Sequence, residues 1–290
     1  MATGSSVLPF ARRRDPRVEV RPAQPGEPVA RTLDEAGFGP HVARLLGYPR
    51  DAPSGEILVA ATGRGRLVGG ACTASFGETG WIGALGVLPR ARRRGVGDLL
   101  TRACVDWLTE RGARTSLLYA TEMGRRVYER AGFVAEAPAR AWRGTPPGPT
   151  FGPSGAARRL RPSDREAILA LDRAASGEDR SAVLDQLPAL LGLALERDDG
   201  TLAAFALNTP WGAGPAVVAA DHDAGIAMLR ALVMEPQPLT LTVPDDNIGV
   251  ATVLREWGFQ CVNTALRMRH GPPVGHDPSK MFGLFNLFFG

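Results

Sequence analysis

The hydrophobic pattern of the first half alternates between short apolar runs and stretches with helical spacing. Runs rich in valine, isoleucine and leucine, bounded by glycine or proline, predict strands at residues 18–26, 56–76, 81–89 and 114–121, the second of them a hairpin. Apolar positions three and four residues apart predict helices at residues 28–47, 95–111 and 123–131, the first broken around residues 37–40. Residues 132–142 predict the beginning of a closing hairpin.

The second half repeats this order of elements. Residues 239–260 match residues 115–134 in register when Gly258-Phe259 is placed on Gly132-Phe133. Ahead of that match the pattern predicts a strand, a capped helix, a hairpin around residues 198–200 and a strand followed by a helix at 214–232. The last ten residues are too short to span a bilayer and predict a final strand buried in the second domain.

A stretch dominated by glycine, proline, serine and threonine separates the two halves. Residues 144–156 cannot support a helix or a central strand, which predicts an interdomain linker. We therefore expect a loose tail at residues 1–16, one domain at residues 17–143 and another at residues 157–290. A length of 290 residues with 44 % hydrophobic residues is enough for two cores of ordinary size.

Composition argues against several classes of partner. The chain has 34 Lys+Arg against 30 Asp+Glu, and the basic residues are scattered, which is not the pattern of a nucleic-acid-binding surface. No apolar run is long enough for a signal peptide or a membrane span. Cys72, Cys104 and Cys261 have no zinc-binding spacing, so we expect reduced thiols, no metal and a cytoplasmic location.

The loop at residues 90–100, "RARRRGVGDLL", has the arrangement of a phosphate-binding site. A strand, a glycine-containing turn and a helix point the free backbone N–H groups of the first helical turn at one spot, where the positive end of the helix dipole also lies. Gly95 and Gly97 allow close approach to the main chain, and the flanking arginines can add charge-assisted hydrogen bonds. An arginine run such as residues 92–94 can also be a solvated face, and only the flanking sequence distinguishes that case from a phosphate-binding loop.

That flanking sequence carries a family resemblance. "GALGVLPRARRRGVGDLL" is similar to the acetyl-CoA signature of the GNAT superfamily of N-acetyltransferases, and about thirty residues later "VYERAGF" resembles the family's Tyr-Glu-x-x-Gly-Phe segment. The resemblance covers roughly residues 17–143. It implies a mixed α/β fold in which two GNAT-like domains each have a mostly antiparallel, twisted sheet flanked by helices.

The resemblance also implies roles for individual residues. Main-chain groups of residues 85–87 are expected to pair with the pantetheine arm, and backbone amides of residues 93–98 to hold the pyrophosphate. Tyr128 is expected to protonate the departing thiolate, and a backbone amide near Val87 to stabilise the oxyanion. The expected catalytic residues are thus Tyr128 and Val87, and the expected cofactor-binding residues are Leu85, Gly86, Val87, Arg92, Arg93, Arg94, Gly95, Val96, Gly97, Asp98 and Thr121.

Four positions depart from the family pattern or leave an alternative open. Thr121 stands where many members have asparagine, and Trp81 stands where histone-type members carry a glutamate base. Glu78, three residues upstream, could act through water or could be a solvated turn residue. Tyr128 could also be an aromatic residue of the helix face that serves only packing.

The second half lacks the features that would bind a cofactor. Asp221 and Asp223 stand where the first half has arginines, and the register of the repeat sets Leu254 opposite Tyr128 and Asn247 opposite Thr121. His222, between the two aspartates, is more consistent with a solvated turn than with a metal ligand. We expect a degenerate GNAT-like domain that shapes the acceptor cleft.

Together these observations predict an acyl-CoA-dependent N-acyltransferase that uses acetyl-CoA and transfers the acyl group directly to an amine. The acceptor is expected to be a small molecule or peptide amine, with no nucleic acid or membrane partner, and the chain a monomer or homodimer. One alternative is a non-catalytic sensor that binds acyl-CoA. An arginine-rich nucleic-acid binder is the other, whose affinity would fall steeply with salt.

Overall fold

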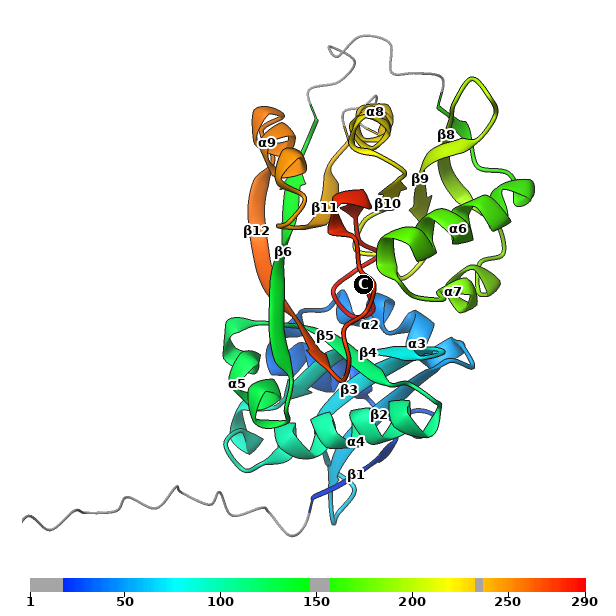
Figure 1. Cartoon of the computed structure of the whole chain (residues 1–290). Helices are drawn as coiled ribbons and strands as arrows, with labels where there is room; N and C mark the ends of the chain where they lie inside the picture. Colours follow the sequence, from blue (N-terminus) through cyan, green and yellow to red (C-terminus); the bar gives the residue numbers. More distant parts are fainter. Residues whose placement is uncertain (1–17, 147–156, 233–236) are drawn as a thin grey trace, which may run out of the picture.

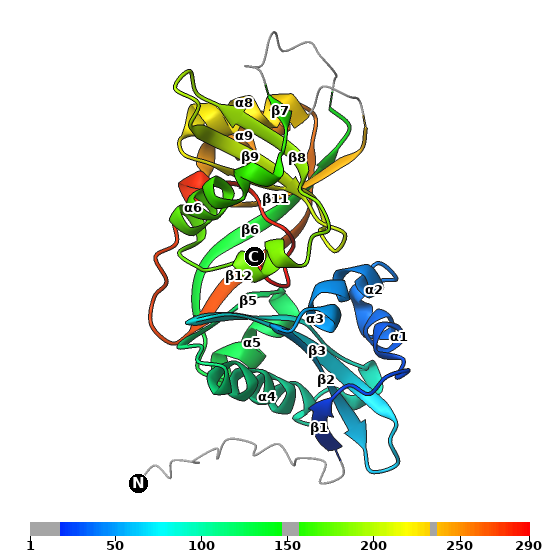
Figure 2. The same ribbon diagram turned by 90° about the vertical axis from the view of Figure 1, so that its right-hand side faces the viewer.

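The computed structural model describes residues 18–146, 157–232 and 237–290, and these form two lobes (Figures 1 and 2). The predicted tail at residues 1–16 and most of the predicted linker lie outside the described residues. The described strands form one sheet of eight, in the order β1-β2-β3-β4-β5-β12-β6-β11, and one of five, in the order β13-β10-β9-β8-β7. Both sheets are flanked by helices, which confirms the predicted mixed α/β class.

The first half contains the elements that the hydrophobic pattern predicts. In chain order they are β1 (Val18–Pro22), α1 (Val29–Leu33), η1 (Asp34–Phe38), α2 (Val42–Leu45), α3 (Gly47–Asp51), β2 (Gly55–Thr62), β3 (Leu67–Phe76), β4 (Thr79–Val87), η2 (Pro89–Ala91), α4 (Val96–Glu110), β5 (Thr115–Ala120), α5 (Glu122–Arg130) and β6 (Val134–Gly144). The predicted break in the first helical region is real, because Gly37 adopts a left-handed conformation with φ of 112°.

The second half follows the same order. Its elements are β7 (Arg158–Arg159), η3 (Pro162–Asp164), α6 (Arg165–Ser176), α7 (Ser181–Asp185), β8 (Leu191–Glu196), β9 (Leu202–Asn208), β10 (Ala216–Ala219), α8 (His222–Leu232), β11 (Leu239–Pro244), α9 (Ile248–Glu256), β12 (Gln260–His270), η4 (Pro278–Lys280) and β13 (Met281–Gly283). The predicted final strand is therefore only three residues long.

The two halves exchange their long strands. β12 of the second half lies between β5 and β6, pairing Leu266 with Ala120, while β6 of the first half pairs along β11, with Gly144 opposite Leu239. Figures 1 and 2 show both strands running through the two lobes. The predicted closing hairpin at residues 132–142 is wrong, because both neighbours of β6 come from the second half. Gly144, predicted as the first residue of the linker, is the last residue of β6.

Helix α4 covers one face of the first lobe's sheet with an apolar stripe. Leu100, Cys104 and Leu108 recur at helical spacing, and all three are fully buried against sheet residues such as Leu58 and Ile82. Each large aliphatic side chain buried in this way contributes about 1.5–3 kcal/mol. This packing fixes the N-terminus of α4 beside the end of β4.

The opposite face of that sheet packs on the second lobe. One continuous apolar cluster contains Tyr48 and Trp81 from the first half together with Phe205, Phe285 and Phe289 from the second. The rings of Tyr48 and Phe289 lie 5.0 Å apart. The halves thus share a core as well as their long strands, so a fragment ending near residue 143 would lack both β12 and this cover.

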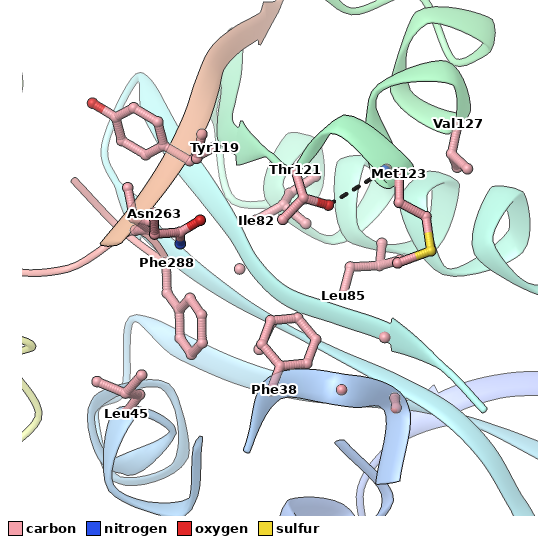
Figure 3. Close-up of a pocket in the computed structure, with 18 of the residues that line it drawn as sticks. Phe38, Leu45, Ile82, Leu85, Tyr119, Thr121, Met123, Val127, Asn263 and Phe288 are labelled. Atoms are coloured by element: carbon pink, nitrogen blue, oxygen red, sulfur yellow. Dashed lines mark hydrogen bonds between the residues drawn. The ribbon is translucent and has the colours of Figure 1, made fainter. Parts of the chain in front are cut away.

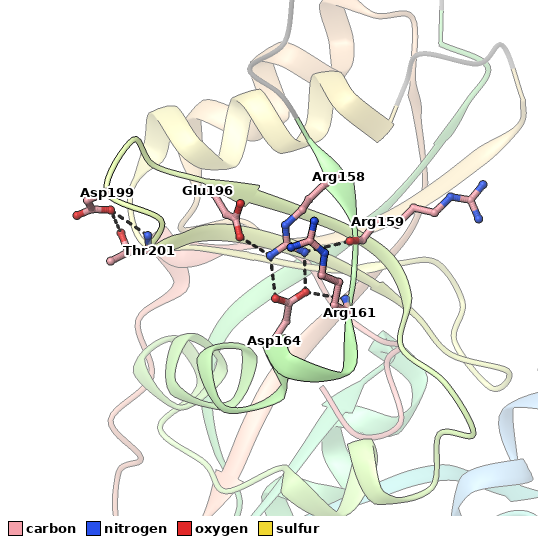
Figure 4. A network of polar contacts seen from close by, with 7 residues as sticks. All are labelled: Arg158, Arg159, Arg161, Asp164, Glu196, Asp199 and Thr201. Atoms are coloured by element: carbon pink, nitrogen blue, oxygen red, sulfur yellow. Dashed lines mark hydrogen bonds and ion pairs between the residues drawn. The ribbon is translucent and has the colours of Figure 1, made fainter.

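A polar network fixes the beginning of the second lobe (Figure 4). The Arg158 guanidinium on β7 donates two hydrogen bonds of 2.8 Å to Asp164 and also pairs with Glu196 on β8. Hydrogen bonding from Arg158 holds the pKa of the Asp164 carboxyl below its ordinary value. The carboxylate also accepts the backbone N–H of Arg161 at 2.7 Å, so it ties β7 to the start of α6.

Candidate active site

The two central strands of the first lobe separate halfway along their length. β4 and β5 are paired in parallel only from Thr79 to Ile82. Beyond that point β4 contains a bulge, because two of its residues oppose one residue of β3, and Ala84 adopts a left-handed conformation with φ of 48°. The bulge bends β4 away from β5, and none of the described strands neighbours the backbone edge of residues 83–87 on that side.

A cavity of about 1080 Å³ occupies this opening. It brings together most of the residues that the sequence predicts for the site, which come from the end of β4, the loop before α4, and α5 (Figure 3). The predicted residues that line it are Leu85, Gly86, Val87, Arg92, Arg93, Gly95, Gly97, Asp98, Thr121 and Tyr128. Arg94 and Val96 do not line it. Val96 is the first residue of α4, and its side chain is buried in the core between α4 and the sheet.

The loop before α4 forms a concave backbone surface. Arg93 and Gly95 both have left-handed conformations, with φ of 62° and 81°, and Gly95 is the N-cap of α4. Gly97 has no such conformation, and a Cβ added there would make only an ordinary contact with Val127 at 3.6 Å. The fold itself therefore tolerates a side chain at 97, and glycine there leaves the N-terminus of α4 open on the cavity side.

Two charged groups of the loop have partners within the protein. The Arg92 guanidinium donates hydrogen bonds of 2.9 Å to the backbone carbonyls of Val87 and Ala36, so it ties the end of β4 to η1. Arg130 of α5 pairs with Asp98 of α4 at 2.8 Å. Arg92, expected to contact the cofactor, thus also has a structural role in holding one wall of the cavity.

Tyr128 lies on the inner face of α5, where its residue is only 7 % exposed. Its ring packs edge-on against Phe133 at 5.8 Å, and burial raises the pKa of its hydroxyl above the ordinary value of tyrosine. Among the described residues none hydrogen-bonds this hydroxyl, although the residue lines the cavity. The hydroxyl is therefore a protonated group available to a ligand.

Thr121 combines a structural contact with its place in the cavity wall. It is the N-cap of α5, and its hydroxyl oxygen accepts the backbone N–H of Gly124 at 3.3 Å (Figure 3). Met123, on the first turn of the same helix, is 72 % exposed and faces the cavity beside Leu85. These apolar side chains form a wall suited to an uncharged, extended ligand.

The position expected for a general base holds a tryptophan that meets a carboxylate from the second half. The indole N–H of Trp81 and the hydroxyl of Thr79 each donate a 2.9 Å hydrogen bond to Glu178, which follows α6. Burial raises the pKa of this carboxyl, while nearby Arg180 acts in the opposite direction. Glu178 is buried and does not line the cavity, so it positions Trp81 at the junction of the lobes.

The other candidate groups lie elsewhere. Glu78 is exposed, pairs with Arg114 at 3.7 Å and does not line the cavity. Cys72 and Cys104 are fully buried outside the cavity wall, and burial raises the pKa of the Cys72 thiol to about 12. Neither thiol can serve as a nucleophile toward a ligand in this cavity.

The far end of the cavity is built by both halves. Phe38 and Phe288 meet edge to face at 5.8 Å, and Tyr119, which stacks on Trp81, contributes a further aromatic wall. Asn263 of β12 lies beside them (Figure 3). The sequence predicted that the second domain shapes the acceptor cleft, but it did not identify Tyr119, Asn263 or Phe288 as residues of the wall. Asn263 follows a bulge in β12, and strand alternation carries no signal for a bulge.

Comparison with known families assigns both halves. The model of the acetyltransferase (GNAT) family matches residues 28–133, and that of the acetyltransferase (GNAT) domain matches residues 168–283. The chain belongs to the GNAT family of acetyltransferases. It is a tandem member, because each half matches separately.

Solved structures share the fold at low identity. A candidate acetyltransferase from Pyrococcus horikoshii is 17 % identical, with a TM-score of 0.75 over 100 % of both chains. A GCN5-related N-acetyltransferase from Sphaerobacter thermophilus is 16 % identical, with a TM-score of 0.58 over 91 % of this chain and 99 % of its own. A tandem GNAT protein from the clavulanic acid biosynthesis pathway is 14 % identical, with a TM-score of 0.58 over 88 % and 99 %. The search of curated proteins found no match.

In the second GNAT half the corresponding opening is filled by the chain itself. β13 pairs with the free edge of β10, with Val217 opposite Gly283, and the N–H of Leu284 donates to the carbonyl of Thr242 on β11 at 2.8 Å. The Asn247 amide, opposite Thr121 in the repeat, donates to the backbone carbonyl of Met281 at 3.0 Å. β13 thus lies between β10 and β11, where the first half has its cavity.

The N-terminus of α8, the helix of the second half that corresponds to α4, is capped by a side chain of the protein itself. The Asp221 carboxylate accepts the backbone N–H of Ala224 at 2.9 Å and pairs with Arg197. This backbone hydrogen bond, assisted by Arg197, holds the pKa of the carboxyl below its ordinary value.

His222 is exposed, and the described residues contain no group of three or more histidine, cysteine, aspartate or glutamate side chains placed to hold a metal. None of the described helices is long and apolar enough to cross a bilayer.

Proposed function

We propose that this GNAT tandem transfers an acetyl group from acetyl-CoA directly to an amine. The observation that carries the proposal is a single cavity that joins the unpaired end of β4, the open N-terminus of α4 and the hydroxyl of Tyr128. Its volume, about 1080 Å³, is at the upper limit of ordinary ligand pockets, which is consistent with two ligands that meet end to end.

The residues present fit such a donor. The backbone edge of residues 85–87 has no strand partner toward β5, so it can pair with an extended amide-containing arm as an additional strand would. The backbone N–H groups at the N-terminus of α4 favour a pyrophosphate there, and the absence of a Cβ at Gly97 keeps them accessible. Arg93 and Arg126 at the cavity wall add positive charge.

When bound, acetyl-CoA supplies an activated acetyl thioester, whose carbon–sulfur bond breaks as the new carbon–nitrogen bond forms. The role expected of the backbone N–H of Val87 is to stabilise the negative charge that develops on the carbonyl oxygen. Tyr128 gives its proton to the leaving sulfur and regains one from solvent, while the amine loses one proton. Because burial raises its pKa, Tyr128 keeps that proton throughout the neutral range.

The proposal is tested by thiol release from acetyl-CoA in the presence of an amine panel, with CoA binding measured on the same preparation. Amine-dependent thiol release with one acetylated product per thiol supports transfer. CoA binding without thiol release from any amine would instead support the sensor alternative. Absence of CoA binding would contradict both.

A further inference from the structure

The cavity wall carries an unbalanced positive charge. Among the described residues Asp98 is the only acidic one that lines it, and Asp98 is already paired with Arg130. None of the other arginines of the wall has an ion-pair partner among the described residues. The six arginines that line the cavity are Arg44, Arg92, Arg93, Arg126, Arg130 and Arg143.

These arginines divide between the two ends of the cavity. Arg93 precedes α4 and Arg126 lies on α5, so both belong to the end where the proposed donor places its phosphates. Arg44 lies on α2 directly before Leu45, and Figure 3 shows Leu45 at the opposite end of the cavity from Val127. Arg44 is therefore distant from the phosphates of the proposed donor.

Arg143 belongs to the part of the cavity wall that the exchanged strands build. Ala141 and Arg143 are two residues apart on β6 and share one face, and Ala141 pairs with Asn263, which also lines the cavity. The Nε of Arg143 lies 3.4 Å from the hydroxyl of Thr240. No described side chain hydrogen-bonds the amide of Asn263, which lies near Phe288 in Figure 3.

We propose that the acceptor is an amine that also carries an anionic group, a carboxylate or a phosphate, which Arg44 and Arg143 bind. This inference rests on the proposed function of the same cavity. Guanidinium groups pair with either anion through two parallel hydrogen bonds, and the aromatic surface of Phe38, Phe288 and Tyr119 suits an apolar body. The described part of this wall offers no unpaired carboxylate to a polyamine or a lysine-rich peptide, and its arginines repel such a cation.

The test compares matched acceptors that differ in the anion. Phenylalanine against phenylalaninamide isolates a carboxylate, and tyramine phosphate against tyramine isolates a phosphate, with spermidine as the cationic extreme. Each is measured for equilibrium binding to the CoA-saturated protein and for acetyl transfer. Arg44→Gln and Arg143→Gln remove one cation each, and Arg64→Gln removes one from the exposed β2–β3 turn as the matched control.

We expect the anionic member of one pair to bind and react at least tenfold better than its neutral partner. Arg44→Gln and Arg143→Gln should each lower that preference by about tenfold or more, the scale of a lost charge-assisted hydrogen bond, whereas Arg64→Gln leaves it unchanged. Which pair shows the preference identifies the anion. Added salt should reduce the preference.

The inference is overturned if the neutral members or spermidine bind and react as well as the anionic ones, or if Arg44→Gln and Arg143→Gln behave like Arg64→Gln. Failure of the proposed function has a different signature, namely CoA binding without transfer to any amine. In that case the binding measurements alone still decide whether this end of the cavity selects an anion.

Discussion

The two halves of the tandem have similar elements around their central openings but differ in what lies inside. Between β4 and β5 the opening is a cavity, whereas between β10 and β11 it holds β13. The helix that follows begins at an open glycine cap in the first half and at a carboxylate cap from Asp221 in the second. Backbone N–H and C=O groups of a buried strand edge are costly to leave without hydrogen bonds. In the second half β13 supplies hydrogen-bond partners to the edge of β10, whereas in the first half the corresponding edge of β4 faces the cavity.

The second half also contributes to the cavity of the first half. β12 completes the sheet of the first lobe beside β5, and residues after β13 continue to the junction, where Phe288 packs on Gly83. A half whose own opening is filled by β13 can therefore still build the far end of the other half's cavity.

The largest effect is expected from a charge placed in the open phosphate site. Gly97→Glu should abolish measurable CoA binding, because the carboxylate projects toward the N-terminus of α4 where the pyrophosphate is expected. The fold should persist, since a Cβ at 97 meets nothing closer than Val127 at 3.6 Å. Calorimetry measures the affinity, and thermal unfolding serves as the control. An unchanged CoA affinity would show that the pyrophosphate binds elsewhere.

The next effect concerns the strand that fills the second opening. Phe282 of β13 is fully buried against Gly225 of α8, and replacing such a phenylalanine by alanine costs about 3–5 kcal/mol. Phe282→Ala should lower the free energy of unfolding by that amount in urea titration, while the folded protein keeps its CoA affinity. Leu191→Ala, at a position 61 % exposed, is the matched control that should change little. Equal free energies of unfolding for the two variants would show that the packing of β13 contributes little to stability.

A smaller effect is expected from the candidate general acid. Tyr128→Phe should keep CoA affinity and lower turnover by about 10²-fold or more, because the proton donor is removed while the ring stays packed against Phe133. Steady-state kinetics with a saturating amine measures the change. Full turnover in the variant would assign Tyr128 to packing alone.

The smallest effect concerns the cap of α8. Asp221→Ala removes the side chain that accepts the N–H of Ala224 and should destabilise the protein by about 1 kcal/mol. It should not create a second CoA site, because β13 still fills the opening. Asp223→Ala removes the same charge two residues further along the chain, and it should lower the free energy of unfolding by less. The appearance of a second site would mean that Asp221 alone excludes the cofactor.

Sequence patterns predicted the local elements and much of the first cavity. Residues 85–87, the loop at residues 92–97 and Tyr128 were predicted from the resemblance of two motifs, about thirty residues apart, to the GNAT family, and the structure brings them to one cavity. The exchange of β6 and β12 was not predictable, because alternation identifies a strand but not its neighbours. Glu178 was missed for a similar reason, since nothing local indicates that it meets Trp81 across 97 residues of sequence.

The stoichiometry of CoA binding tests the difference between the halves most directly. Isothermal titration of the full chain with CoA should give one site per chain, and a crystal structure of the complex should place the ligand between β4 and β5 with β13 still paired to β10. Two sites per chain, or a ligand that displaces β13, would contradict the assignment of an open first half and a filled second half.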